Sequence, residues 1–162
     1  MVKREDELLR EKVTALCFQT LVPLKDTLSL IVTSHLFVEF WLDWLIRASI
    51  PKPEKLLDNG RLTFAQKLAL AESLGLLDAK VAEAIQLLNN IRNKVSHNLV
   101  YKGAQKDLQL LAKLISNLSN EEQLISKKLK SPKKELVFFC TYFAGYAVGF
   151  VRGRTDALEA PE

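Results

Sequence analysis

The sequence has few of the residues that interrupt or cross-link a chain. Its 162 residues include six glycines, five prolines and two cysteines. This scarcity excludes a collagen-like chain and a small disulfide-stabilised scaffold. Cys17 and Cys140 lie in apolar stretches without the CxxC or histidine-rich spacing of a metal site. We therefore predict two free, buried thiols, and neither a metal nor a cofactor.

A strong excess of charge of one sign is also missing. Lysine and arginine number 23 against 19 aspartates and glutamates, a formal net charge of +4. So small an excess is weak evidence for a nucleic-acid partner. The N-terminal segment MVKREDELLREK is charged and shows no apolar stretch typical of a secretory signal. We therefore expect a cytoplasmic protein.

Leucine is abundant, with 30 residues against 25 for valine, isoleucine and threonine together. This balance favours helices, because leucine keeps its rotamers in a helix and β-branched residues lose theirs. The length is that of one ordinary domain. We predict an all-α fold, an up-and-down bundle of about five to six helices. The predicted domain covers residues 1–155, and a disordered tail is predicted at 156–162.

Apolar residues that recur every three or four positions place the helices. They predict helices at about residues 3–19, 26–49, 64–74, 79–97, 104–129 and 132–151. Thr63 and Asp78 are candidate N-caps, and Gly75 ends the third helix. The fifth helix has an alternative end near its middle, where serine and asparagine cluster at residues 116–120. The segment before Thr63 is predicted to be a turn-rich connection.

Two of the expected helices are unusually apolar. The helix at 26–49 is apolar almost all round, which predicts a central position with Trp41 and Trp44 in the core. Residues 136–151 form an uncharged run of 16 that includes regularly spaced glycines. This run fits either a membrane helix with a GxxxG contact face or a core helix with a close neighbour. Because a spanning helix needs about 20 apolar residues, we predict a core helix and no membrane partner.

Polar side chains form a stripe beside the apolar face of the helix at 79–97. At about 100° per residue, Arg92 falls inside the apolar arc, and Ser96, Asn89, Asn93 and His97 follow it around the helix. A guanidinium that faces the core is costly unless it is paired or lines a cavity. The stripe is therefore the candidate site. The alternative is structural: Arg92 caps carbonyls or pairs with a buried acid, and His97 bonds the last turn.

On one copy of this helix, the arginine and the histidine are too far apart to contact the same phosphate. Arg92 and His97 diverge by about 140° and lie about 7.5 Å apart along an ideal helix. In a two-fold homodimer, the same helix arriving antiparallel brings His97 of one copy near Arg92 of the other. Imidazole can move the protons and guanidinium can stabilise the phosphorane, so such a cleft has the groups that cleave RNA without a metal.

The segment Arg92-Asn93-x-x-x-His97 resembles the Arg-x4-His signature of HEPN domains. Upstream, residues 62–68, 74–77 and 88–93 are similar to the mannitol-repressor-like branch of that superfamily, and the resemblance covers about residues 28–100. It implies an all-helical, usually dimeric bundle with Arg92 and His97 at a composite cleft. Active members are metal-independent endoribonucleases of toxin–antitoxin, abortive-infection and RNA-processing systems. Other members are noncatalytic, and the mannitol repressors are regarded as transcriptional regulators.

The resemblance also implies partners, and the sequence departs from it at one position. RNA and an antitoxin or regulatory protein are the expected partners of a homodimer. Toxins paired with a nucleotidyltransferase antitoxin carry a tyrosine two residues after the histidine. Here Leu99 stands at that position, and Tyr101 lies two residues further on. Control by nucleotidylation of that tyrosine is therefore not expected.

The apolar second helix carries a secondary set of candidates, which recur at every fourth position: His35, Glu39, Asp43 and Arg47. We predict that His35 and Arg47 lie on a solvated edge with internal ion pairs. For Glu39 two interpretations stand side by side. It belongs to that edge, or it orients the residues of the candidate site across the bundle.

A cluster of lysines between the last two helices is the third candidate. Lys127, Lys128 and Lys130 could contact phosphates nonspecifically, although a solvated linker has the same composition. Taken together, the sequence predicts an RNA-binding protein or metal-independent endoribonuclease with a composite homodimer site. The alternative is a noncatalytic regulator. The expected roles are acid and base for His97, phosphate stabilisation for Arg92 and positioning for Asn93. Supporting residues are Ser96, Asn89 and Glu39.

Overall fold

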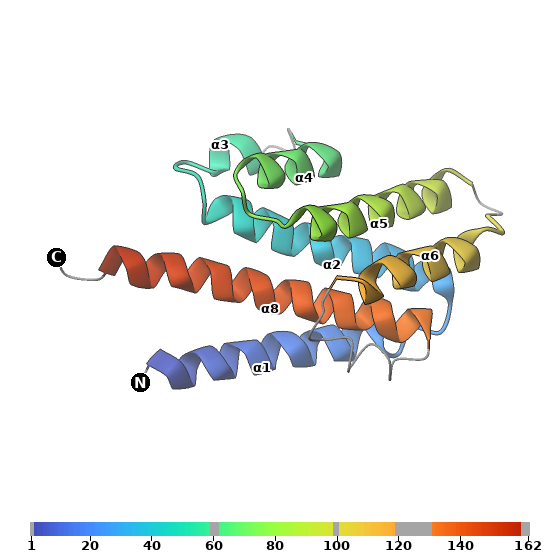
Figure 1. The fold of residues 1–162 in the computed structure, drawn as a ribbon, viewed down its shortest axis with the longest axis horizontal. Coiled ribbons are helices and arrows are strands. Elements are labelled where there is room, and N and C mark those ends of the chain that lie inside the picture. The colour runs from blue at the N-terminus through green and yellow to red at the C-terminus, as the bar shows by residue number, and fades with distance from the viewer. Residues whose placement is uncertain (1, 59–61, 99–100, 119–130, 160–162) are drawn as a thin grey trace.

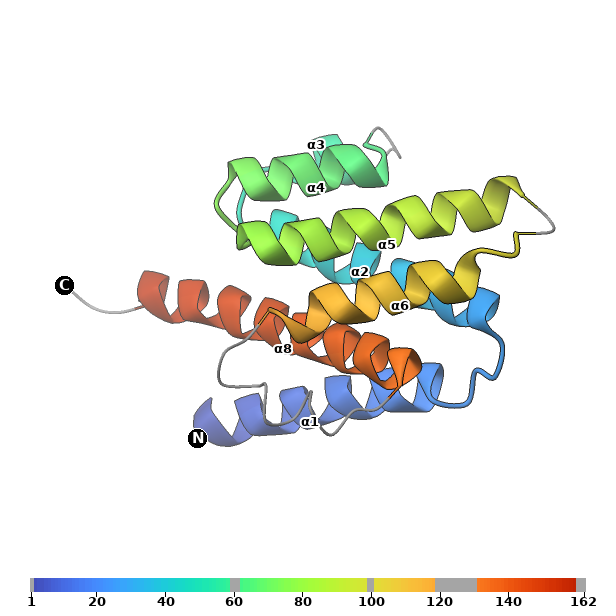
Figure 2. The same cartoon turned by 45° about the vertical axis from the view of Figure 1, so that its right-hand side comes forward.

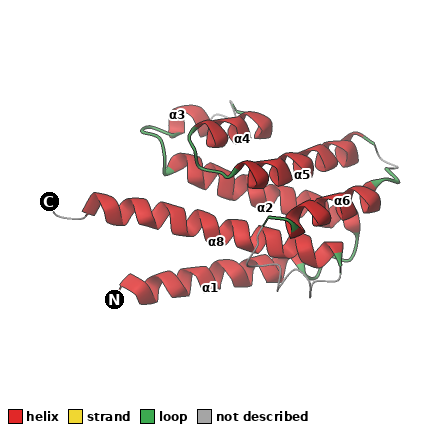
Figure 3. Ribbon diagram, viewed as in Figure 1, coloured by secondary structure: helices red, strands yellow, loops and turns green. Residues whose placement is uncertain are grey.

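The computed structural model describes residues 2–58, 62–98, 101–118 and 131–159. Within those ranges every regular element is a helix (Figure 3). The helices are α1 (Val2–Leu21), α2 (Thr27–Arg47), α3 (Glu54–Leu57), α4 (Phe64–Ser73), α5 (Ala79–His97), α6 (Ala104–Ser116) and α8 (Pro132–Glu159). The predicted all-α helical bundle is confirmed.

Local signals determine where several helices begin and end. The side chain of Asp78 accepts a hydrogen bond from the backbone N of Lys80 at 2.8 Å and caps α5. Thr63 and Gln66 form a capping box at the start of α4. Just after α4, Gly75 has a φ of +67°, in the left-handed region that favours glycine. The predicted N-caps and the predicted stop are confirmed.

Three predicted boundaries differ from the structure. The connection before Thr63 contains the short helix α3. The helix α6 ends at Ser116, so its alternative end is the observed one, and residues 119–130 lie outside the described part. The helix α8 continues past the predicted end at Val151 to Glu159, and residues 156–159 of the predicted tail are helical. Adding residues to an existing helix costs little free energy, and the next strong stop signal in the sequence is Pro161.

The helix α8 runs through the middle of the bundle and packs against α1, α2 and α6 (Figures 1 and 2). The helix α5 packs against α2, α4 and α6. Nine residues of α2 are buried, so α2 shares the centre with α8, as its apolar sequence predicted. The C-terminal end of α5 lies at the end of the molecule remote from the two chain termini (Figure 1).

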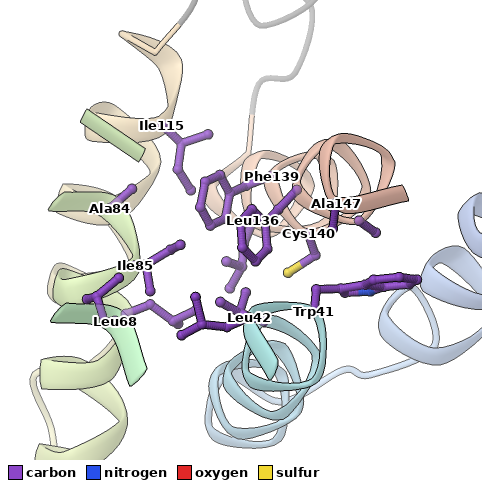
Figure 4. Packing of buried hydrophobic residues seen from close by; sticks show 14 of the residues in the cluster. Trp41, Leu42, Leu68, Ala84, Ile85, Ile115, Leu136, Phe139, Cys140 and Ala147 are labelled. Carbon is purple, nitrogen blue, oxygen red and sulfur yellow. The ribbon is translucent and has the colours of Figure 1, made fainter. Parts of the chain in front are cut away.

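The uncharged run of α8 buries one face in the core. Its buried residues are Leu136, Val137, Phe139, Cys140, Phe143, Ala144, Ala147 and Val148, several of which are shown in Figure 4. By length and composition, both α2 and α8 could cross a membrane, but 50% and 44% of their apolar windows are buried inside the protein. The predicted core packing of α8 is confirmed, and the expected lack of a membrane partner stays a prediction.

The two cysteines are free thiols in the interior, as predicted. Cys17 of α1 and Cys140 of α8 are both fully buried. Burial raises the pKa of each thiol, so both stay protonated and unreactive near neutral pH. Trp41 is buried in the core, and Trp44 is partly buried against it.

Candidate functional site

The predicted polar stripe lies on the C-terminal half of α5. Asn89 is buried, Arg92 and Asn93 are half-buried, and Ser96 and His97 are exposed. Arg92 Nη1 donates a hydrogen bond to Asn93 Oδ1 at 3.2 Å. Among the ion pairs of the described residues, none joins Arg92 to a carboxylate. The guanidinium is therefore oriented by a neutral neighbour, and within the described part of the chain most of its donors remain available for an anion.

Asn89 connects the stripe to the interior of the bundle. It is 6% exposed, and its Oδ1 accepts a hydrogen bond from His35 Nε2 of α2 at 3.1 Å. The ring of His35 packs against Phe64 of α4 with ring centroids 4.2 Å apart. His35 is 2% exposed, so its predicted position on a solvated edge is wrong. The reason is that this side of α2 faces α4 and α5, which cover it.

His35 is held in its neutral form by its surroundings. Burial lowers the pKa of His35, and the hydrogen bond with Asn89 opposes this effect. The charge of Arg92 lowers the pKa further, and that of Glu39 raises it. Its Nδ1 is buried without a partner among the described residues. A proton added to this ring would lie in the core near a guanidinium, which is unfavourable.

Acid is expected to destabilise the protein partly through His35. Its folded-state pKa lies below the ordinary value, so the unfolded chain takes up a proton first as the pH falls. The stability contributed by the neutral ring is complete above about pH 6.5 and is lost as the pH falls toward the folded-state pKa. His35→Gln removes this titration and keeps an N–H for Asn89.

Urea unfolding of both proteins at about pH 7.5 and about pH 5 measures this effect. The wild type is expected to lose more free energy of unfolding between the two pH values than His35→Gln. Because the carboxylates titrate in both proteins, the difference between the two losses reports on His35. Equal losses would contradict the assignment.

Glu39 is part of a second polar cluster, between α2 and α4. Its Oε1 accepts a hydrogen bond from Lys67 Nζ at 2.9 Å, and Asp43 Oδ2 accepts one from the same nitrogen at 3.1 Å. Burial lowers the pKa of Lys67, but the bonds to the two carboxylates outweigh it and raise the pKa above its ordinary value. In the described part of the chain, the carboxylate of Glu39 therefore bonds to Lys67 and ties α4 to α2, not to Arg92 or His97.

His97 is the last residue of α5, and two contacts with Asp107 of α6 lie on either side of it in the sequence. Lys94 Nζ lies 3.0 Å from Asp107 Oδ2 of α6. The hydroxyl of Tyr101 donates a hydrogen bond to the same carboxylate oxygen. These bonds attach the end of α5 to the start of α6. His97 is thus exposed at a helix end that is tied to α6, and the hydroxyl of Tyr101 is hydrogen-bonded to Asp107.

The predicted lysine cluster falls largely outside the described residues. This applies to Lys127, Lys128 and Lys130. The nearby Lys133 has a structural role, because its Nζ donates hydrogen bonds to the carbonyl oxygens of Val22, at 2.7 Å, and Leu24. Across the described ranges there is also no group of histidine, cysteine, aspartate or glutamate that could hold a metal ion.

No family model, no curated protein and no solved structure matches this chain. What defines its class is the fold, an all-α helical bundle.

Three kinds of polar group lie on the C-terminal half of α5: a guanidinium that pairs with no carboxylate among the described residues, amides, and an exposed imidazole. His35 is the residue whose place sequence reasoning misjudged. The signal that could have placed it in the interior is its position on the most apolar helix of the chain.

Proposed function

We propose that this protein binds RNA at the C-terminal end of α5 and cleaves it without a metal, at a cleft shared by two copies of the chain. The observation that carries the proposal is Arg92. A half-buried guanidinium usually pairs with a carboxylate, but here Asn93 is its hydrogen-bond partner among the described residues. A phosphate of the RNA backbone would supply the missing negative charge.

Each side chain has a distinct role in this proposal. One His97 takes the proton from the 2′-hydroxyl, whose oxygen attacks the adjacent phosphorus. The second His97 of the cleft protonates the leaving 5′ oxygen. Arg92 stabilises the negative charge of the phosphorane. Asn93 holds the guanidinium in position, and Asn89 anchors the stripe through His35.

The need for a second copy follows from the geometry of one helix. Arg92 and His97 point about 140° apart on α5, so they do not meet at one phosphate. A second copy can nonetheless reach both residues, since Arg92 is half-buried and His97 is exposed at the edge of the molecule. A two-fold arrangement supplies the complementary residue from the partner.

Incubation of purified protein with mixed RNA in EDTA tests the proposal. Wild type is expected to cleave, His97→Ala to bind without cleaving, and Lys80→Ala to behave as wild type. Lys80 is a matched control because it is an exposed cation at the opposite end of α5. If neither wild type nor His97→Ala cleaves, the enzymatic part of the proposal is wrong. Binding that Arg92→Ala then weakens would leave a noncatalytic RNA-binding protein.

A further inference from the structure

His35 of α2 lies in the interior directly behind the candidate site on α5. It is 2% exposed, and Asn89, which connects it to the polar stripe, is 6% exposed. The Nε2 atom of its ring donates a hydrogen bond to Asn89 Oδ1 at 3.1 Å. The ring also packs on Phe64 of α4, with centroids 4.2 Å apart. A ligand at the surface of α5 therefore acts on His35 through its charge and not through contact.

Two charged side chains influence the ring of His35. Arg92 lies one helical turn beyond Asn89 on α5, and Glu39 lies one turn beyond His35 on α2, so both are close neighbours of the hydrogen-bonded pair. In the described part of the chain, these are the charges that shift the pKa of His35, Arg92 downward and Glu39 upward. On α4, the cation of this region is Lys67, whose Nζ lies 2.9 Å from Glu39 Oε1. The carboxylate is thus already balanced, whereas no carboxylate of the described residues balances the guanidinium.

The hydrogen bond to Asn89 suits both protonation states of the ring. The amide oxygen can accept from Nε2 in the neutral ring and in the cation. The ring gains its second proton at Nδ1, which is buried without a partner among the described residues. Because a cationic donor strengthens the bond to the amide oxygen, the ring keeps its place against Asn89 when it titrates. A change in its charge does not by itself require α5 to shift.

We propose that an anion bound at Arg92 and a proton bound at His35 stabilise each other. The inference rests on the proposed function, because an RNA phosphate is the anion that this site takes there. The anion cancels part of the guanidinium charge and so removes part of the penalty on the protonated ring. Since such coupling is reciprocal, a proton on His35 strengthens the binding of the anion by the same factor. His35 is therefore a buried regulator that makes RNA binding tighter in acid.

The direction of this pH dependence follows from the pKa of His35. Burial, followed by the charge of Arg92, holds that pKa below its ordinary value, against the opposing effect of the bond to Asn89. A bound anion raises the pKa, but burial still keeps it below the ordinary value of about 6.5. His35 therefore adds nothing to the RNA affinity near neutral pH. Its contribution grows as the pH falls through the pKa of the ligand-bound chain and is complete below that of the free chain.

Binding of a 2′-O-methyl oligouridine at about pH 7.5 and about pH 5 tests the inference. Its blocked 2′ oxygen cannot attack the phosphorus, and it carries no group that titrates in this range. Fluorescence anisotropy measures its affinity for the wild type and for His35→Gln. Between the two pH values, the affinity of the wild type is expected to increase by about three-fold or more beyond the increase of His35→Gln. His97 and the carboxylates titrate in both proteins, so the difference reports on His35.

Proton NMR follows the pKa of His35 directly. The chain has two histidines, so the His35→Gln spectrum identifies the signal of His35 by its absence. Arg92→Gln removes the guanidinium charge and is expected to raise the pKa of His35, as is addition of the oligonucleotide to the wild type. Lys80→Gln is the matched control, because Lys80 is an exposed cation about 13 Å from Asn89 along α5. It is expected to leave the pKa of His35 unchanged.

Three results would overturn the inference. They are a pKa of His35 that Arg92→Gln moves no more than Lys80→Gln does, a ring that stays neutral down to the pH of unfolding in every sample, and an RNA affinity with the same pH dependence in the wild type and His35→Gln. Failure of the proposed function is recognised separately. If the wild type binds no oligonucleotide at either pH, the proposed function is wrong, and the NMR titration of His35 with and without sulfate then decides the inference.

Discussion

An excess of inactive His97→Ala chains is expected to suppress the activity of wild-type chains. His97→Ala by itself is expected to lower RNA cleavage by about 100- to 10,000-fold, because it removes the groups that move the protons. Arg92→Ala is expected to lower it by about 100- to 1,000-fold, because it removes the cation that stabilises the phosphorane. Both effects are large since the proposal assigns proton transfer to His97 and charge stabilisation to Arg92.

The suppression follows from a cleft that holds both histidines. When the two chains are refolded together with the variant in roughly ten-fold excess, about one wild-type chain in ten finds a wild-type partner. Cleavage per wild-type chain is therefore expected to fall about ten-fold. A site complete within one chain would leave it unchanged. That outcome would contradict the shared cleft, even if His97 itself proved essential.

A matched variant separates this effect from nonspecific competition for RNA. His97→Ala combined with Arg92→Ala also removes the guanidinium that is proposed to bind the phosphate. In the same excess it is expected to suppress wild-type activity as His97→Ala does, because it still exchanges into the dimer. Loss of the suppression in this double variant would indicate that the chains compete for RNA.

Phe139→Ala is expected to lower the free energy of unfolding by about 3–5 kcal/mol. Phe139 is 1% exposed, and its ring stacks on Phe143 with centroids 6.3 Å apart and planes within 9°. It lies on the side of α8 that packs against α6, close to Ile115 (Figure 4). Truncation would remove apolar packing inside the core cluster and leave a cavity that the surrounding helices cannot fully close.

Urea unfolding followed by circular dichroism measures this change. The control is Phe18→Ala on α1, where the ring is 48% exposed, and its expected cost is below about 1 kcal/mol. If both substitutions cost the same, α8 would not be the centre of the core. The result bears on the run 136–151, because a helix that faced lipid along its length would not show such a contrast.

The fold could be predicted from the sequence to a large extent. Periodicity and capping residues depend on neighbours within a few positions, so the starts of α4 and α5 at Thr63 and Asp78 follow from local chemistry. The ends of α6 and α8 were harder to predict. They depend on whether polar residues such as Asn117 cap a helix or lie within it, and the sequence favours neither.

The candidate site was predictable in its residues but not in its partners. The register of α5 identified Arg92 as an arginine among apolar positions, and it is half-buried. The same reasoning placed His35 in solvent, because the sequence does not reveal which helices cover that side of α2. Glu39 had two possible roles, and its partner, Lys67, lies on a different helix.

The sequence by itself determined the helices, most of their caps and the polar stripe at the end of α5, because all of these follow from interactions within one or two helical turns. Only the tertiary structure decided that His35 is buried against Asn89 and that Glu39 binds Lys67. His35 and Asn89 are 54 positions apart. Contacts over such separations depend on how whole helices pack, and that is set by the sum of many small apolar contacts that no single segment specifies.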